Sequence, residues 1–381
     1  MLRVFRRLAL VLAVLAPLAL GAASAGAAHN ASFLNMLAAA PSITATTNPG
    51  NGDQNPYGVA VVPAGFPSDG AVHAGDILIS NFNNSANLQG AGTTIAKVSP
   101  AGHTSAFFTA PSSLAPVGLT TALVALRSGL VIVGNTPTTD GTASTVSNGS
   151  LIFLDEHGTV LLNLVDSSLL QGPWDMAADD TDPDAPILYV SNVLSGTITR
   201  INLSVSRAEG RPIPVIGSLT LIGSGFMHRT DPNALLVGPT GLLLARDHRT
   251  LYVADTGNNR IQVLRNVRET ESDLGHGQTL LSGAPLKGPL ALAWSPTGTI
   301  VASNGDAAGN ASTPANMVVE FQPQTGEVVA TRQLDRTMSG TPPSIVPGAI
   351  FGITIAPVSG KPSLVYANDN TGTVDVLPPA R

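Results

Sequence analysis

The chain repeats one short pattern six times: a strand of apolar residues that ends in a small residue followed by Asn or Asp. The six copies end at Asn81, Asn135, Asn192, Asp255, Asn304 and Asn368. These positions are separated by 49 to 64 residues, and recurrence of one element at such intervals is typical of a repeat architecture. The number of copies therefore predicts the fold more firmly than any local propensity.

Each copy follows a turn rich in Pro or Gly and a strand of small and apolar residues, and precedes a third strand. In the fourth unit these strands are 239–244, 251–255 and 260–264. Small residues suit an inner strand where backbones crowd, and Pro suits its first residue because no ladder hydrogen bond is lost there. Several third strands alternate apolar with polar residues, which is typical of a half-exposed strand. We therefore expect each unit to be one antiparallel blade, with a fourth, outer strand in the first five.

The sixth unit ends after three strands, because two prolines and the C-terminal residues follow Leu377. A segment at 42–47 can supply its fourth strand, which would remove the last open sheet edge. We predict an all-β fold, a six-bladed β-propeller of four-stranded antiparallel blades over residues 41–381, with the ring closed by this N-terminal strand. A short helix is expected at 31–40.

The first 25 residues are predicted to be a signal peptide. Three arginines among the first seven residues precede an apolar run at 8–20, and small residues at 23–25 supply a cleavage site. The apolar run is shorter than the roughly 20 residues that span a bilayer. We expect an exported protein, periplasmic or extracellular, that is not inserted in the membrane after cleavage and carries an N-terminal segment at 26–40 before the propeller.

Composition narrows the class of partner. The formal net charge is −6, about −9 without the three arginines of the predicted signal peptide, and the chain holds three lysines and no Cys. A basic surface for nucleic acid is therefore absent, and we exclude DNA and RNA as partners. The 39 glycines and 29 prolines, with 43% hydrophobic residues, fit many short strands joined by turns rather than a disordered chain.

The fourth unit resembles an NHL repeat, the unit of a family of six-bladed propellers. Asp255, Asn258 and Arg260 carry the match, and the third unit keeps Asn192 and Arg200. The resemblance implies that the Asp and Asn side chains tie the turn between the second and third strands, as Asx side chains do for exposed turn amides.

The six Asn and Asp residues of the repeat are also candidate metal ligands. The chain is distantly similar to the gluconolactonase and lactonase propellers, which implies Asn and acidic side chains around a central calcium with its 6–8 oxygen ligands. That family carries an acidic residue just before a Gly-Pro turn, whereas this chain has Gln171, Val237 and Lys287 there. One turn bond repeated in every blade explains six equivalent positions, so we expect no cofactor, with Ca²⁺ as the alternative.

Four residues follow turns into inner strands, so we expect them at the mouth of the central channel: Tyr57, Trp174, Asp175 and Phe351. The aromatic rings could stack a sugar or another planar ligand, or they could plug the channel, and the sequence leaves both interpretations open.

Long loops are predicted on the rim where the inner strands begin, at 82–92, 136–149, 205–236, 305–316 and 334–347. Loops gathered on one rim are common binding surfaces. His228 opens the longest of these regions and is the candidate acid or base of a hydrolase or lyase. An acidic run at 179–184 lacks the Gly and Glu of an EF-hand loop, so we expect a solvated turn on the opposite face.

The sequence favours a protein that is not an enzyme. In this first hypothesis an exported, monomeric NHL-type propeller is a binding scaffold for a protein, a glycan or a small molecule on the long-loop face. The alternative is a metal-dependent, lactonase-like hydrolase, or a lyase, with its site at the channel mouth. A cell-envelope scaffold without a ligand is a third hypothesis. The missing acidic residues favour the first, since the fold alone does not decide function.

Overall fold

The computed structural model describes residues 32–231, 234–304, 316–335 and 350–380. The chain divides into two units, and the first of them, residues 1–30, lies outside the described residues together with the predicted signal peptide. The second unit, residues 31–381, contains every strand of the fold. Within the described ranges no helix combines the length and apolar character that a membrane crossing requires.

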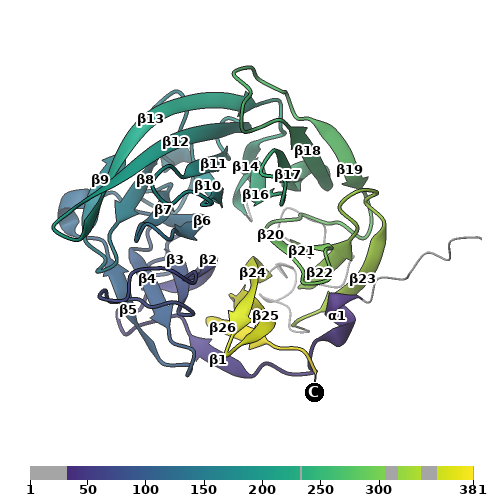
Figure 1. Cartoon of the computed structure of the whole chain (residues 1–381), viewed down its shortest axis with the longest axis horizontal. Helices are drawn as coiled ribbons and strands as arrows, with labels where there is room; N and C mark the ends of the chain where they lie inside the picture. Colours follow the sequence, from purple (N-terminus) through teal and green to yellow (C-terminus); the bar gives the residue numbers. More distant parts are fainter. Residues whose placement is uncertain (1–31, 232–233, 305–315, 336–349, 381) are drawn as a thin grey trace, which may run out of the picture. The chain divides into compact units, whose positions relative to one another are not determined.

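Six four-stranded antiparallel sheets are arranged as blades around a common axis, which confirms the predicted fold (Figure 1). Blades 1 to 3 are formed by β2 (Gln54–Val61), β3 (Ile77–Asn83), β4 (Thr94–Val98) and β5 (Thr104–Thr109); β6 (Leu119–Ala125), β7 (Val131–Asn135), β8 (Ser150–Leu154) and β9 (Val160–Leu164); and β10 (Pro173–Asp179), β11 (Ile187–Asn192), β12 (Thr197–Ala208) and β13 (Arg211–Gly223). Blades 4 and 5 are formed by β16 (Pro239–Leu244), β17 (Thr250–Asp255), β18 (Arg260–Arg265) and β19 (Gln278–Ser282); and β20 (Leu292–Trp294), β21 (Ile300–Asn304), β22 (Met317–Phe321) and β23 (Val328–Gln333). A hairpin of β14 (Arg229–Asp231) and β15 (Leu235–Val237) lies between blades 3 and 4 in the chain.

Blade 6 joins the two ends of the propeller. Its strands are β24 (Ile350–Val358), β25 (Lys361–Asn368), β26 (Thr373–Leu377) and the N-terminal β1 (Ile43–Thr46). The purple β1 pairs with the yellow β26 over its whole length, from Ile43 opposite Val376 to Thr46 opposite Thr373 (Figure 1). The predicted closure by an N-terminal strand is therefore confirmed.

The segment before β1 is anchored to blade 5 by two charged side chains. The one-turn helix α1 (Phe33–Met36) begins on Glu320, which is fully buried. Glu320 Oε2 accepts hydrogen bonds from Ser32 Oγ at 2.7 Å and Leu34 N–H at 3.0 Å, and Oε1 accepts from Phe33 N–H at 2.9 Å. The guanidinium of Arg332 donates to backbone carbonyl oxygens of the same segment. Charges of opposite sign therefore satisfy both ends of this helix.

The predicted long loop at 205–236 is wrong in its first half. Strands β12 and β13 continue outward as a long hairpin that turns at Glu209 and Gly210. Along β12, Leu203 and Val205 are buried while Ser204 is exposed, so the apolar and polar alternation of a strand runs on through the region. The first half of the region is therefore a strand hairpin and not a loop, as its alternation of apolar and polar residues indicates.

Side chains of one blade form hydrogen bonds with backbone groups of the inner strand of the next blade. Each inner strand pairs with its own second strand on one edge, and no sheet extends from blade to blade within the described residues. Ser80 Oγ donates to Thr120 O at 2.6 Å, Thr120 Oγ1 donates to Pro173 O at 2.8 Å, and Ser303 Oγ donates to Phe351 O at 2.8 Å. The small residue before the repeated Asn in blades 1 and 5 is therefore a hydroxyl that links neighbouring blades.

The remaining junctions use other groups for the same purpose. Thr256 Oγ1 in blade 4 donates to a proline carbonyl of blade 5 at 2.8 Å. Between blades 3 and 4, Asp175 Oδ2 accepts a hydrogen bond from Leu242 N–H at 3.0 Å. Between blades 6 and 1 the two backbones lie close together at Gly352. A Cβ at this position would lie 2.2 Å from Tyr57 O, so a residue with a side chain would clash there. Among these contacts between neighbouring blades, the one made by Asp175 is the one that uses an ionisable side chain.

We expect Glu320→Ala to lower the free energy of unfolding by about 2–4 kcal/mol, because three donors of the N-terminal segment lose a buried acceptor. Glu327→Ala, at an exposed position of the same blade, is the matched control and should change stability by less than about 0.5 kcal/mol. Chemical unfolding followed by tryptophan fluorescence measures both. Equal stability of the two variants would contradict the anchoring role of Glu320.

Candidate functional site

The repeated Asn side chains cap turns of their own blades. Asn135 Oδ1 accepts a hydrogen bond from Gly118 N–H at 2.7 Å, and Asn192 Oδ1 accepts one from Gln171 N–H at 3.1 Å. Asn304 makes the equivalent bond in blade 5. In each case the acceptor lies at the end of the second strand and the donor in the turn that precedes the inner strand. These three side chains therefore stabilise the turn that leads into the inner strand of their own blade.

The other three members of the repeat make different bonds, so the expectation of one turn bond repeated in every blade is confirmed for Asn135, Asn192 and Asn304 and is wrong for Asn81 and Asn368. Asp255 accepts from Asn258 Nδ2 at 3.0 Å and lies 3.7 Å from Arg260 Nε, as the NHL resemblance implies. Asn81 Nδ2 donates to Thr47 O, directly after β1, at 2.8 Å, and Asn368 Nδ2 donates to the Asp335 carboxylate after β23 at 3.0 Å. Each of these side chains is bonded to a different group, so these bonds do not direct them towards one common point on the axis.

The described donor set does not fit a resident calcium ion. Within the ranges that the structure describes, no three His, Cys, Asp or Glu side chains are grouped so that they could hold a metal. Asn81 Oδ1 and Asn368 Oδ1 are buried without a hydrogen-bond partner, which leaves two oxygens where calcium needs about 6–8. We therefore derive no chemical step through a metal.

The three aromatic candidates lie together and fill the axis on the long-loop side. The rings of Tyr57 and Phe351 stack at 4.5 Å between centroids, and the Trp174 ring meets Tyr57 edge-on at 5.7 Å. Phe82 packs against both Tyr57 and Trp174, and all four side chains are buried. Because these rings bury one another, their arrangement fits a plug better than an open stacking platform.

A cavity of about 360 Å³ lies on the other side of this plug. Its lining runs from Asp175 and Gly352 near the plug to Pro63 and Asp180, which follow the ends of β2 and β10. The cavity mouth is therefore on the face that carries the turns between first and second strands. All six inner strands or their flanking residues contribute: Val59, Ala60, Val61, Pro63, Thr121, Leu123, Val124, Ala125, Leu126, Asp175, Met176, Ala178, Asp180, Leu242, Ala291, Leu292, Gly352, Ile353 and Thr354.

A β-bulge directs Asp175 into this cavity. The pairing of β10 with β11 shifts by one residue between Pro173 and Asp175. Such an extra residue re-aims neighbouring side chains, so Trp174 joins the plug while Asp175 lines the cavity. The sequence predicts Asp175 at the channel mouth beside the aromatics; the structure separates the two, with the rings closing one end and the carboxylate lining the space beyond them.

The Asp175 side chain is half-buried and lines the cavity. Oδ1 accepts from Met176 N–H at 2.8 Å and Oδ2 accepts from Leu242 N–H at 3.0 Å. Burial raises the pKa of Asp175 from 3.8 to about 7, although both hydrogen bonds favour the ionised form and oppose the rise. A carboxyl that is about half ionised near neutral pH suits the transfer of protons.

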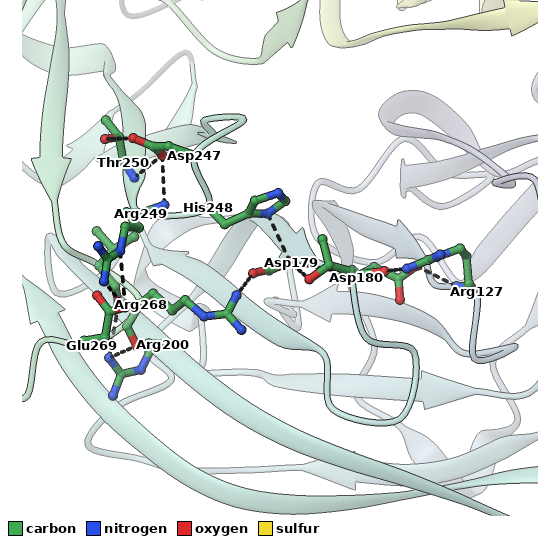
Figure 2. A network of polar contacts seen from close by, with 12 residues as sticks. Arg127, Asp179, Asp180, Arg200, Asp247, His248, Arg249, Thr250, Arg268 and Glu269 are labelled. Carbon is green, nitrogen blue, oxygen red and sulfur yellow. Dashed lines mark hydrogen bonds and ion pairs between the residues drawn. The ribbon is translucent and has the colours of Figure 1, made fainter.

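Charged side chains join blades 2, 3 and 4 at the end of β10 (Figure 2). Of these residues Asp180 also lines the cavity. Asp180 Oδ2 accepts from Arg127 N–H at 2.7 Å and lies 3.4 Å from Arg127 Nε, which links blades 2 and 3. Asp179, whose side chain is 1% exposed, lies 3.2 Å from His248 Nδ1 and pairs with Arg268, which links blades 3 and 4. The expected solvated turn is therefore wrong for these two residues, because their partners come from neighbouring blades; the rest of the run, including Asp184, is mostly exposed.

His228 lies apart from the cavity. Its side chain is exposed at the start of the β14–β15 hairpin, and its Nδ1 is 3.2 Å from Phe226 O. It is not among the cavity-lining residues. Of the predicted long loops, 305–316 and 334–347 lie almost entirely outside the described residues. Sequence inspection missed the lining residues Thr121 and Thr354, which carry no motif.

No family model matches the sequence, and no curated protein matches it at a significant level. The structure is similar to a gluconolactonase from Xanthomonas campestris, at 14% identity and a TM-score of 0.52, over 86% of this chain and 87% of that chain. It is also similar to regucalcin of Agrobacterium tumefaciens, described as a calcium-binding protein, at 13% identity and a TM-score of 0.50, over 89% of this chain and 96% of that chain. At these identities the likeness establishes the propeller fold.

The expectation of a non-enzymatic binding scaffold on the long-loop face is corrected by these comparisons. The similar structures are described as a gluconolactonase and a calcium-binding regucalcin, and neither is described as a binding scaffold. The cavity whose wall includes the half-buried Asp175 carboxyl opens on the face opposite the long loops. The NHL identity of the repeat is matched by no family model and stays a prediction.

We expect Asp179→Asn to lower the free energy of unfolding by about 1–3 kcal/mol, because Arg268 and His248 lose a buried anionic partner. Asp184→Asn, in the same turn but exposed, should change stability by less than about 0.5 kcal/mol. Urea unfolding of the two variants tests the difference. A fully solvated acidic turn would give two equal and small changes.

Proposed function

We propose that the chain is a hydrolase of lactone-like small molecules that acts in the axial cavity, with Asp175 as general base. The observation that carries the proposal is the placement of one carboxyl, with a pKa of about 7, in the wall of a cavity of about 360 Å³. The similarity of the fold to a gluconolactonase supports the reaction class. Export is part of the proposal and rests on the N-terminal sequence pattern alone, and a monomeric state is proposed with it.

The cavity accounts for how a substrate would be oriented. Its end near Tyr57 and Trp174 is closed by the aromatic plug, so a substrate enters from the opposite mouth. Its leading end then lies against Asp175. The hydroxyl-bearing Thr121 and Thr354 line the same cavity and could donate to the substrate carbonyl oxygen.

The proposed reaction adds one water molecule across the ring ester bond. The ionised Asp175 carboxylate takes a proton from water while the water oxygen bonds to the carbonyl carbon. The ring C–O bond then breaks, and the leaving alkoxide takes the proton back from Asp175. The product is the open hydroxy acid, which releases its own proton to the solvent, and Asp175 returns in its ionised form.

Replacing Asp175 tests the proposal directly. We expect Asp175→Asn to lower kcat/KM for lactone hydrolysis by about 10²–10⁴-fold, because the amide cannot take a proton from water. The substitution also removes one backbone hydrogen bond, because the amide nitrogen cannot accept from an N–H, so circular dichroism must show that the variant is folded. Asp184→Asn is the control and should keep the wild-type rate. Wild-type activity in Asp175→Asn would exclude Asp175 as the base.

The pH dependence follows from the raised pKa of Asp175. The base is active when ionised, so kcat/KM should rise with pH through a midpoint near the pKa of about 7. The folded state holds this proton more tightly than the unfolded chain, so the free energy of unfolding should fall as the pH rises from 3.8 to about 7. Asp175→Asn should remove this contribution from the stability profile. A midpoint near 4 in the rate profile would contradict the assignment.

A further inference from the structure

The axial cavity presents a polar surface to a ligand, and its charged groups are of one sign. Its exposed lining is more polar than apolar, because backbone groups reach it together with the side chains of Thr121, Asp175, Asp180 and Thr354. The ionisable side chains among the described lining residues are the two carboxyls, with no Arg, Lys or His. Resting on the proposed hydrolase function, we propose that the substrate is a small amino lactone, which carries an ammonium group next to its ring ester.

Asp175 is the carboxyl that the ammonium group would contact. Its oxygens accept hydrogen bonds from Met176 N–H and Leu242 N–H, and no cationic side chain of the described residues forms an ion pair with it. A carboxylate that is partly removed from water is unfavourable unless a positive charge compensates it. An ammonium group in the cavity would supply that charge and donate to the lone pairs that the backbone leaves unused.

The cations at the end of β10 are each held by another acid, so they leave the carboxyl deeper in the cavity uncompensated. Arg127 Nε lies 3.4 Å from Asp180 Oδ2, while Asp180 Oδ1 has no hydrogen-bond partner among the described residues. Arg268 pairs with the carboxylate of Asp179, and His248 Nδ1 lies 3.2 Å from it. A ligand that enters at the mouth therefore passes a paired carboxylate before it reaches the unpaired one.

Charge also separates an amino lactone from other polar lactones. An anionic lactone would lie beside Asp175 and repel its ionised form, which the proposed reaction requires. A neutral polyol could hydrogen-bond to the polar lining, but it would leave the carboxylate without a counterion. Hydrogen bonds to charged partners are roughly twice as strong as those between neutral groups, so an ammonium group gains the most from this wall.

The position of the amino group next to the carbonyl fits the proposed reaction. In an α-amino-γ-lactone a single carbon atom joins the ammonium nitrogen to the carbonyl carbon, so both can lie beside one carboxyl. One oxygen of Asp175 can then accept from the ammonium group while the other takes the proton of the attacking water. The cavity volume of about 360 Å³ corresponds to on the order of ten water-sized groups at about 30 Å³ each, which accommodates one ring with a small substituent.

The test compares two lactams of equal size on the wild-type protein: an α-amino-γ-lactam and the α-hydroxy-γ-lactam. Lactams resist hydrolysis, so calorimetry measures binding alone. The amino lactam is mostly charged at neutral pH, since an α-amino group has a pKa of about 7.7–8.0, and the hydroxy lactam is neutral. We expect the amino lactam to bind about 10–100-fold more tightly, because a charged donor meets the Asp175 carboxyl.

Two variants show whether this preference comes from the cavity carboxyls. Asp175→Asn keeps the size of the side chain and removes its charge, so the preference for the amino lactam should fall below about 3-fold. Asp180→Asn keeps Asp175 and leaves the Arg127 guanidinium without its partner, so the amino lactam should bind about 3–10-fold more weakly and the hydroxy lactam unchanged. Asp184→Asn, in the same turn but exposed, is the matched control and should bind both as the wild type does. Circular dichroism shows whether each variant folds.

The corresponding lactones test the same preference in the reaction. The α-amino group also makes a lactone more reactive in water, so kcat/KM of each lactone is divided by its own uncatalysed rate constant, with the products separated by chromatography. We expect this ratio to be at least about 10-fold higher for the amino lactone than for the hydroxy lactone.

The outcomes separate the substrate class from the reaction. If the hydroxy lactam binds as tightly as the amino lactam, and Asp175→Asn removes hydrolysis of the hydroxy lactone, the inference is overturned while the hydrolase proposal stands. If neither lactone is hydrolysed but the amino lactam is preferred and Asp175→Asn removes the preference, the hydrolase proposal fails and the inference on the ligand class holds. If neither lactam binds to the wild-type protein, the inference is overturned.

Discussion

The inner edge of each blade is the constraint on which the rest of this propeller depends. An inner strand pairs with its own sheet on one side only, and its backbone groups on the other side need partners that no neighbouring sheet of the described chain supplies. Hydroxyls of Ser80, Thr120 and Ser303 satisfy carbonyls of the next blade, and between blades 3 and 4 the carboxyl of Asp175 accepts a backbone N–H instead. The requirement that closes the ring thus also places an ionisable group at the axis.

The two roles of Asp175, as a hydrogen-bond acceptor between blades and as a cavity-lining residue, have opposite effects on its pKa. As a structural acceptor it holds two backbone N–H groups, which favours its ionised form, and burial by the surrounding protein desolvates it, which favours its neutral form. Desolvation is the larger effect and raises its pKa to about 7. The aromatic plug of Tyr57, Trp174 and Phe351 closes one end of the axis, so the same carboxyl lines a cavity that is open to solvent at the opposite end.

The sequence predicted the blades and their closure because both follow from local patterns: a strand motif repeated six times and an unpaired N-terminal strand. It did not predict which end of the axis is open, because the plug forms from side chains of three blades that meet only after folding. The pairing of Asp179 with Arg268 was missed for the same reason, since the partners belong to different blades. The local turn bonds of Asn135 and Asn192 could be anticipated, because each spans a single blade.

The central claim is that the carboxyl of Asp175 stays protonated up to near neutral pH inside the cavity. Its most direct test is the titration of that carboxyl by ¹³C NMR on protein labelled at the Asp carboxyl carbon, with the signal assigned by its loss in Asp175→Asn. The account predicts a midpoint near the pKa of about 7 and a further change when a cavity ligand binds. A midpoint near 4, the value of a solvated Asp, would contradict it.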